Sequence, residues 1–298
     1  MSPKKILLVA NTAWNLWNYR QALTRALQDA GFEVVLAAPG DRFISLLETR
    51  FVPLLHLSRR SFSFFQNLRT LLELYHLFRR ERPDVVLLYT IKPNILGNVA
   101  AWLACSPTVS VVEGLGHSGT SAAQWRWLAA PLYRLALRSA RRVIFLNHDD
   151  AQAFLQQKIA APAQIAVIPG PGVDTDYFCP PTTPRTPSTD TVFLFFGRLL
   201  SEKGIHEFVE AAHMVARLGG VRAEFRVLGS PDPGNPATVL EEQVGIWQHA
   251  GIVQFIGAAD DVRPHVAAAD VLVVTVPLTT ATAAMIAARQ LGLMKPDA

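Results

Sequence analysis

Residues 192–218 have the sequence VFLFFGRLLSEKGIHEFVEAAHMVARL, and they contain the unit from which the fold can be built. The apolar run Val192–Phe196 predicts a buried strand, and a glycine-containing turn separates it from a predicted helix at Lys203–Leu218. The apolar residues that share one face of this helix are Ile205, Phe208, Val209, Ala212, Val215 and Ala216. A buried strand followed by an amphipathic helix indicates a parallel α/β sheet.

The same alternation of short apolar runs and helical patterns recurs along the chain. Before residue 169 the predicted strands are Lys5–Ala10, Glu33–Ala38, Phe51–Leu57, Asp84–Thr90, Thr108–Glu113, Arg142–Asn147 and Gln164–Ile168. After residue 190 the further predicted elements are strands Ala223–Leu228, Ile252–Ile256 and Val271–Val276 and helices Ala237–Ala250 and Val262–Ala269. The sequence therefore predicts two Rossmann-like parallel sheets.

A proline-rich stretch, PGPGVDTDYFCPPTTPRTPSTD at residues 169–190, interrupts this alternation and has no sustained helical period. A length of 298 residues suits two domains, since single cores stop growing near that size. We expect an N-terminal domain at 1–172, a linker at 173–190 and a second domain at 191–298.

Composition favours a globular chain with a large core, because 50% of residues are apolar and 17% are charged. No apolar run reaches the 18 or so residues of a membrane span, and Asn11 ends KKILLVA too early for a signal peptide. Cys105 and Cys179 lack metal-ligand spacing and suit a reducing compartment. We expect a cytoplasmic protein.

Charge differs between the two halves. Residues 1–172 hold 19 Lys/Arg and 10 Asp/Glu, a net of +9, whereas residues 173–298 hold 9 and 14, a net of −5. Two groups of arginines contribute most: Arg59, Arg60, Arg69, Arg79, Arg80 and Arg82, and Arg126, Arg134, Arg138, Arg141 and Arg142. The second group accompanies Trp125 and Trp127, a combination that suits an anionic membrane surface, although a solvated helix face explains the charge equally well. No nucleic-acid-binding module accompanies the charge, so we expect no nucleic acid partner.

Residues 114–119, GLGHSG, spell the G-x-G-x-x-G pattern of dinucleotide-binding turns. That motif requires an acidic residue about 20 positions later, but no Asp or Glu occurs from Thr120 to His148. The pattern also follows four earlier predicted strands instead of the first one. It therefore predicts a glycine-rich turn at the end of a strand, where backbone can approach a ligand closely.

The turn after Val192–Phe196 carries two cations, Arg198 and Lys203, at the start of a predicted helix. A diphosphate bound there would meet both cations and the partial positive charge of the helix N-terminus. Such a site stabilises a departing nucleoside diphosphate. The alternative is that both residues merely decorate a turn.

Longer motifs in the second half, GRLLSEKGI, VLGSPDPGNP and IVQFIGAADDVRPHVAAADVLVV, closely resemble the donor-binding domain of glycosyltransferase family 4, whose members have the two-domain GT-B fold. The segment IPGPGVDTDYFCP resembles the interdomain segment of that family. In the first half, TIKPNILGNVAA and VVEGLGHSG resemble the branch that extends polyprenyl-diphosphate-linked sugars in surface polysaccharide and glycan assembly. The resemblance covers about residues 4 to 276.

The resemblance implies donor-side roles in the second half. Arg198 and Lys203 would hold the donor diphosphate, Gly197 and Gly229 would lie close to the donor, and the backbone near Val253–Ile256 would face the base.

It also implies an acceptor side in the first half. Gly114 and Gly116 would line the cleft between the domains, and His117 is the polar catalytic candidate there, although a turn histidine is often structural. Asn11 and Lys92 stand after predicted parallel strands, where ligands collect, but a helix cap and a solvated lysine account for them equally well.

Asp174 and Asp176 form the Asp-x-Asp pattern that holds a divalent metal in another class of glycosyltransferases. Their place in a proline-rich segment favours turn formation instead. We expect no metal and no cofactor, with a nucleotide-diphosphate sugar as donor substrate.

The sequence departs from the family pattern after Val274. The family has a Pro-Ser…Glu-Gly loop and an E-x7-E element there, but this chain has no glutamate between Asp270 and Ala298. We interpret the tail as the result of a shifted frame or premature stop that leaves the second domain incomplete.

Together these features predict a retaining hexosyl- or N-acetylhexosaminyltransferase, impaired by truncation, that uses a lipid-linked saccharide acceptor at the inner face of the membrane. One alternative is a non-catalytic remnant that binds membrane or acceptor through the first domain. Another is a nucleotide-sugar epimerase of the same architecture, which would not need the basic tryptophan-bearing segment.

Overall fold

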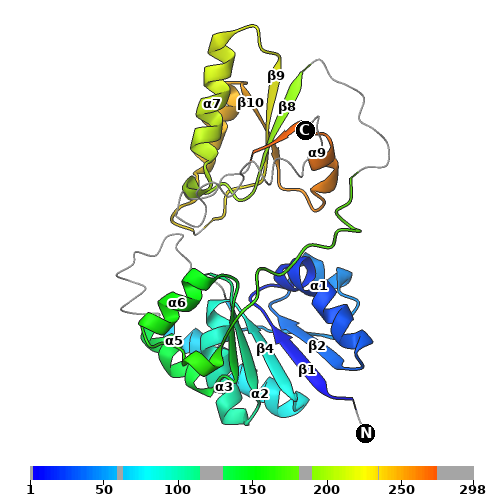
Figure 1. Cartoon of the computed structure of the whole chain (residues 1–298), viewed down its shortest axis with the longest axis vertical. Coiled ribbons are helices and arrows are strands. Elements are labelled where there is room, and N and C mark those ends of the chain that lie inside the picture. Colours follow the sequence, from blue (N-terminus) through cyan, green and yellow to red (C-terminus); the bar gives the residue numbers. More distant parts are fainter. Residues whose placement is uncertain (1–2, 59–62, 115–129, 181–189, 234, 274–298) are drawn as a thin grey trace. The chain divides into compact units, whose positions relative to one another are not determined.

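The computed structural model describes residues 3–58, 63–114, 130–180, 190–233 and 235–273. The chain divides into two compact units, residues 1–174 and 175–298 (Figure 1). The division falls within the predicted linker at 173–190.

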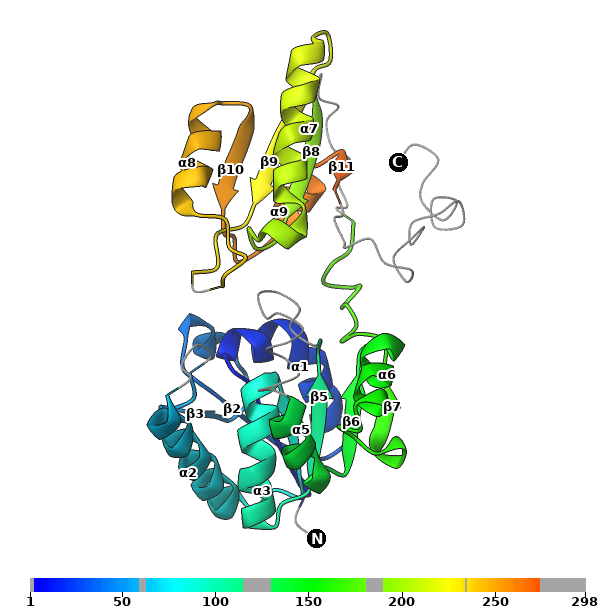
Figure 2. The same cartoon turned by 90° about the vertical axis from the view of Figure 1, so that its left-hand side faces the viewer.

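The first unit is built on a seven-stranded parallel sheet with the order β3-β2-β1-β4-β5-β6-β7. Figure 2 shows β2 and β3 toward one side of this sheet and β6 and β7 toward the other. Its strands are β1 Lys5–Val9, β2 Glu33–Ala38, β3 Phe51–Pro53, β4 Val85–Tyr89, β5 Thr108–Val112, β6 Arg142–Phe145 and β7 Ile165–Val167. The order reverses direction between β1 and β4, so the carboxyl ends of these two strands form the switch point at which open α/β sheets bind ligands.

Helices connect these strands. They are α1 Ala13–Asp29, α2 Phe64–Glu81, α3 Asn98–Ala104, α5 Ala130–Ala136 and α6 His148–Gln156, with short turns η1 Arg42–Leu46, η2 Pro93–Gly97, η4 Leu137–Ser139 and η5 Pro162–Gln164. Both faces of the sheet are covered, because Leu7 and Val9 pack against one hydrophobic cluster and Ile6 and Leu8 against the other. This explains why β1 and β2 are continuous apolar runs.

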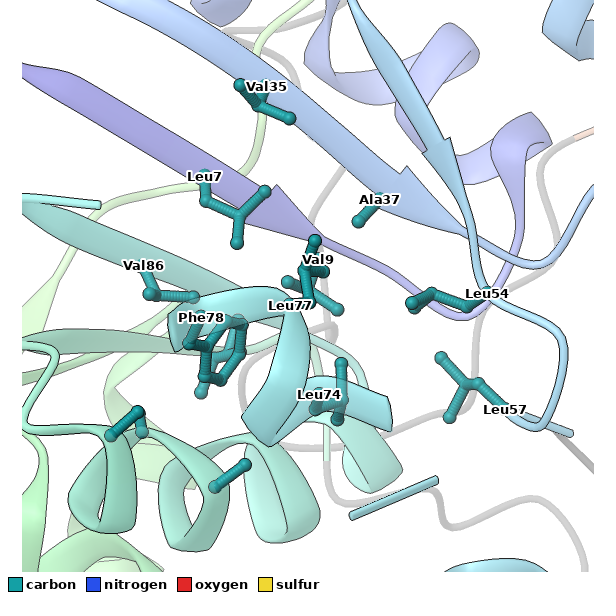
Figure 3. Packing of buried hydrophobic residues seen from close by; sticks show 14 residues of the cluster. Leu7, Val9, Val35, Ala37, Leu54, Leu57, Leu74, Leu77, Phe78 and Val86 are labelled. Atoms are coloured by element: carbon teal, nitrogen blue, oxygen red, sulfur yellow. The ribbon is translucent and has the colours of Figure 1, made fainter. Parts of the chain in front are cut away.

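One of the two clusters joins the sheet to α2. Leu7, Val9 and Val86 of the sheet lie among Leu74 and Phe78 of the helix (Figure 3). All five side chains are buried. Burial of this kind fixes α2 and the segment that precedes it on one face of the sheet.

A buried polar network fixes the turn η2 and α3 against β5. Asn98 is fully buried, and its amide group donates to the Ser110 hydroxyl (2.7 Å) and to the Asn94 carbonyl (2.6 Å). Its amide oxygen accepts from the Thr108 hydroxyl at 2.5 Å, and the Asn94 amide donates to the Val111 carbonyl at 2.9 Å. The asparagines of TIKPNILGNVAA are therefore structural, because each satisfies buried groups of the neighbouring strand.

The second unit contains a four-stranded parallel sheet with the order β10-β9-β8-β11 (Figure 2). Its elements are β8 Thr191–Phe196, η6 Ser201–Lys203, α7 Ile205–Leu218, β9 Ala223–Leu228, α8 Glu241–His249, β10 Val253–Gly257, α9 Arg263–Ala267 and β11 Val271–Leu272. The predicted apolar face of α7 is confirmed for Ile205, Phe208, Val209 and Ala212, which are buried against this sheet, and for Val215, which is partly buried. The prediction was wrong for Ala216, which is exposed near the end of the helix.

Several predicted element boundaries differ from the structure, and the structure gives the cause for three of them. Strand β3 ends at Pro53 because the Glu73 carboxylate accepts from the Leu55 and His56 amides, which turns the chain away from the sheet. The helix predicted from Lys203 begins at Ile205, since Lys203 lies in a 3-10 turn and Gly204 (φ +70°) ends it.

The helix predicted from Ala237 begins at Glu241. The preceding residues pair with the segment after β8 instead, through a bridge between Leu200 and Thr238. The tail after Val273 lies outside the described residues, so the predicted interruption there is not described by the structure.

Candidate active site

Three adjacent strands of the second unit each end at a glycine with positive φ: Gly197 (+152°), Gly229 (+154°) and Gly257 (+86°). The Gly197 amide donates to Leu228 O at 2.9 Å, and the Gly229 amide donates to Gly257 O at 2.8 Å. A Cβ atom on Gly229 would lie 1.8 Å from Gly197 O. The three strand ends are thus packed backbone to backbone, and a side chain at Gly229 would not fit between them.

Arg198 follows Gly197 at the switch point between β8 and β11. Its Nη1 donates to Asp232 Oδ2 at 2.8 Å; the Arg198 side chain is 50% exposed, whereas Asp232 is buried. The Asp232 amide in turn donates to the Thr238 hydroxyl at 2.8 Å. The buried Asp232 carboxylate therefore fixes one N–H group of the guanidinium, and the other N–H groups can bind an anion.

Lys203 lies in the same connection between β8 and α7, in the 3-10 turn Ser201–Lys203, and is exposed. The Ser201 amide donates to Ala237 O at 2.8 Å, and the Lys203 amide donates to Leu200 O at 2.8 Å. These bonds fix the turn just before the N-terminus of α7, a helix of 14 residues. Both predicted cations thus belong to one braced loop at the carboxyl edge.

Sequence reasoning missed Asp232. The signal was present, because VLGSPDPGNP was recognised as a motif, but only its Gly229 received a role. The segment Val253–Ile256, predicted to face the donor base, lies in β10 at the edge of the sheet, where Phe255 stacks on Trp247 at 6.1 Å. Its predicted role stays a prediction.

In the first unit, Asn11 lies after β1 but does not cap α1. Thr12 is the N-cap, and its hydroxyl accepts from the Asn15 amide at 3.1 Å. The Trp14 amide donates to the Asp41 carboxylate at 2.9 Å, so this helix start already holds an acidic side chain. The helix-cap explanation of Asn11 is wrong, and its acceptor role stays a prediction.

Lys92 follows β4, and its ammonium group donates to the Ser58 carbonyl at 2.6 Å. Burial lowers the pKa of Lys92. The alternative of a freely solvated lysine is therefore wrong. The lysine ties the segment after β3 to the end of β4, next to the switch point.

An ion pair between a buried arginine and a half-buried glutamate, which the sequence did not predict, also lies at the carboxyl edge of this sheet. Arg20 of α1 donates through Nη2 to Glu113, the residue that follows β5, and its guanidinium carbon lies 4.1 Å from the centre of the Tyr89 ring on β4. Burial lowers the pKa of Arg20 and raises that of Tyr89 to about 12, while the Arg20 charge opposes the rise. Gly114 follows Glu113 with φ +146°, and no atom of the residues that the structure describes lies within 4 Å of a Cβ built on Gly114.

His117 and Gly116 lie outside the described residues, as do Trp125, Arg126 and Trp127. Within the described ranges no group of three or more His, Cys, Asp and Glu side chains could hold a metal ion. Asp174 and Asp176 are exposed. In that same part of the chain, none of the helices has both the length and the apolar character needed to cross a bilayer.

Residues 16–171 match the family model described as a glycosyl transferase 4-like domain. The chain belongs to this glycosyl transferase 4-like family. Residues 190–293 match a second model, glycosyl transferases group 1. The recognition predicted from the motifs is confirmed, and the protein is a glycosyltransferase.

Two curated relatives are similar to this glycosyltransferase. It is 24% identical over 275 residues to the N,N'-diacetylbacillosaminyl-diphospho-undecaprenol alpha-1,3-N-acetylgalactosaminyltransferase of Campylobacter jejuni, an alignment that covers 87% of this chain and 70% of the relative. It is 30% identical over 165 residues to the UDP-Gal:alpha-D-GlcNAc-diphosphoundecaprenol alpha-1,3-galactosyltransferase of Escherichia coli, covering 52% of this chain and 42% of the relative. The chain therefore spans less than half the length of the second relative.

A solved structure of Anabaena HepE in complex with UDP and glucose is similar in fold. The TM-score is 0.68 at 20% identity, over 92% of this chain and 74% of that one. The predicted GT-B fold, with its two parallel sheets, is confirmed.

Proposed function

We propose that this glycosyltransferase moves a hexosyl or N-acetylhexosaminyl group, with retention, from a nucleotide-diphosphate sugar to a polyprenyl-diphosphate-linked saccharide in surface polysaccharide or glycan assembly. The observation that carries the donor half is Arg198, held by buried Asp232 beside Gly197 and Gly229 at a switch point. Two curated relatives named for undecaprenyl-diphosphate acceptors support the acceptor half.

The chemistry follows from the placement of charge. Negative charge develops on the diphosphate as the bond to the sugar breaks, and a preorganised guanidinium stabilises it. Asp232 fixes one N–H of Arg198 and leaves the others for phosphate oxygens. Lys203 supplies a second cation from the same loop, and Gly197, which lacks a side chain, would let the nucleotide approach the backbone closely.

Calorimetry with UDP tests the donor site. A charge-assisted contact is worth roughly 1.5–3 kcal/mol, so Arg198→Ala and Lys203→Ala should each weaken binding about tenfold or more. Arg217→Ala, at the opposite end of α7, is the matched control and should leave affinity unchanged. Equal affinity in the Arg198/Lys203 double variant and the control would refute the assignment.

Transfer assays test the reaction. We expect transfer from a UDP-sugar to a synthetic polyprenyl-diphosphate saccharide, with the anomeric configuration of the product, read by NMR, equal to that of the donor. Inversion would refute the retaining mechanism. Nucleotide binding without transfer to any saccharide would favour the non-catalytic alternative.

We also place the protein at an anionic membrane surface. Phe64 and Phe65 begin α2 and are each 74% exposed, and Leu68, Arg69 and Leu72 continue the exposed side of the helix. Because α2 ends beside the amino edge of β4, its start lies toward the carboxyl edge, where the acceptor is proposed to bind. Exposed aromatic residues next to arginine suit a lipid headgroup layer.

Liposome cosedimentation tests this placement. Phe64→Ser/Phe65→Ser should weaken binding to anionic vesicles at least tenfold, whereas Leu218→Ser, an equally exposed apolar residue of the second unit, should not. High salt should weaken binding, because the basic residues are screened. Equal binding to neutral and anionic vesicles would contradict the proposal.

A further inference from the structure

The Arg20–Glu113 pair lies where β4 and β5 of the first unit end. Arg20 reaches from α1 across the ring of Tyr89, the last residue of β4, to Glu113 directly after β5. The pair therefore lies beside the switch point between β1 and β4. Its two members are 93 positions apart in the chain.

The two side chains differ in exposure. The Arg20 side chain is 6% exposed, whereas that of Glu113 is 24% exposed. The arginine thus stays inside the unit and holds a carboxylate that faces outward. A carboxylate accepts several hydrogen bonds, so the one from Arg20 leaves capacity for a ligand.

Glu81 of the same unit has a purely structural carboxylate and serves for comparison. The Glu81 side chain is 3% exposed and accepts from Arg50 (2.9 Å), Arg80 (3.1 Å) and Lys5 (3.4 Å). It lies at the amino edge of the sheet, next to the start of β1. Both of its oxygens are occupied and it is closed to solvent, unlike Glu113.

Two further buried polar atoms at the carboxyl edge have no hydrogen-bond partner among the described residues. Thr90, which follows Tyr89, has φ +68°, and its hydroxyl is buried. Among the described residues no hydrogen-bond partner reaches Thr90 Oγ1 or Arg20 Nε. A non-glycine residue with this backbone conformation and orphaned polar atoms are typical of a binding site. Among the described residues, no atom lies within 4 Å of a Cβ built on Gly114, the residue next to Glu113.

We infer that the Glu113 carboxylate binds a hydroxyl group of the acceptor saccharide and that Arg20 is a positioning residue that holds it there. This inference rests on the proposed function for the existence of a saccharide acceptor. Saccharides present hydroxyl donors, and a carboxylate fixed by a buried guanidinium is a strong acceptor for them. Neither residue is needed for nucleotide binding, which the second unit supplies.

A double-mutant cycle on the full chain tests the inference. In Glu113→Gln we expect kcat/KM for the polyprenyl-diphosphate saccharide to fall about 10- to 100-fold, with KM for the nucleotide sugar changed less than about twofold. Arg20→Met should lower the same parameter, and Arg20→Lys, which keeps the charge, should restore part of it. Glu81→Gln is the matched control: it should lower Tm but leave acceptor kinetics unchanged at temperatures where the chain is folded.

The double variant Arg20→Met/Glu113→Gln separates a binding role from a structural one. It removes both charges, so its Tm should lie closer to the wild-type value than the Tm of either single variant, because neither charge is left without its partner. We expect acceptor kcat/KM to stay low. Recovery of kcat/KM together with Tm would overturn the inference and leave the proposed function intact.

Failure of the proposed function would give a different result in the transfer assays. If the wild-type chain transfers to a free saccharide but not to a polyprenyl-diphosphate one, the proposed acceptor is wrong, and the same variants assayed on the free saccharide still decide the role of Glu113. If the wild-type chain binds UDP but transfers to neither acceptor, both proposals are overturned.

Discussion

Replacing Gly229 with alanine should destabilise the second unit more than replacing Gly197 does, although the two residues have nearly the same φ, +154° and +152°. A side chain at either position must adopt a conformation that L residues rarely occupy, at a cost of roughly 1–3 kcal/mol. At Gly197 the new Cβ meets no atom within 4 Å in the described part of the chain, so only the cost of backbone strain applies. Gly197→Ala is therefore the control for backbone strain.

At Gly229 the new Cβ would lie 1.8 Å from Gly197 O and 2.9 Å from Gly197 C. The ends of β8 and β9 must separate to relieve this overlap. The bonds from the Gly197 amide to Leu228 O and from the Gly229 amide to Gly257 O would then lengthen. Each is worth about 0.5–1.5 kcal/mol, so Gly229→Ala should cost about 1–3 kcal/mol more than Gly197→Ala.

Urea unfolding followed at Trp247 measures this difference. Trp247 is the tryptophan of the second unit and stacks on Phe255, so 5-fluorotryptophan labelling with Trp247→Phe for assignment isolates its ¹⁹F signal. Signals of the first unit should keep their midpoint in both variants. Equal loss of unfolding free energy in Gly197→Ala and Gly229→Ala would refute the packing argument.

Three further predictions concern the first unit. Asn98→Ala should lower its unfolding free energy by about 3 kcal/mol or more in urea, because three buried hydrogen bonds are lost; a loss below about 1 kcal/mol would contradict the network. Burial alone would raise the pKa of Glu81, but Arg50, Arg80 and Lys5 outweigh it and lower the pKa below its ordinary 4.5. The contribution of ionised Glu81 to the free energy of unfolding is therefore present above pH 4.5 and is lost as pH falls through the lowered pKa. Glu81→Gln should therefore flatten the fall in unfolding free energy below pH 4.5, and an unchanged fall would count against the cluster. Burial raises the pKa of Tyr89 to about 12, so the contribution of neutral Tyr89 to the free energy of unfolding is present below pH 10 and is lost as pH rises toward 12. Tyr89→Phe should remove that alkaline fall in unfolding free energy. An identical fall in both proteins would argue against burial of the hydroxyl.

The strands were largely predictable. The predicted bounds of β2 and β9 match the structure, because a proline follows the first run and a glycine follows the second. Errors arose where a distant or backbone feature intervened. Glu73 takes the amides that would have extended β3, and the positive φ of Gly204 delays α7 by two residues.

The site was predictable only in part. Gly197, Arg198 and Lys203 follow one strand, so the sequence already places them together at its carboxyl end. Asp232 was missed because it is 34 positions from Arg198, and nothing local links them.

The sequence by itself determined the alternation of strands and helices, the family and the cations after β8, because periodicity and local motifs depend on neighbours along the chain. Only the tertiary structure decided which side chains meet across strands. The order β1-β4-β5 brings Arg20 over Tyr89 to Glu113, and the order β9-β8 sets Gly229 against Gly197. Such contacts depend on sheet order and on which face each helix covers, and these are fixed by burial of apolar surface summed over the whole unit and not by any single segment.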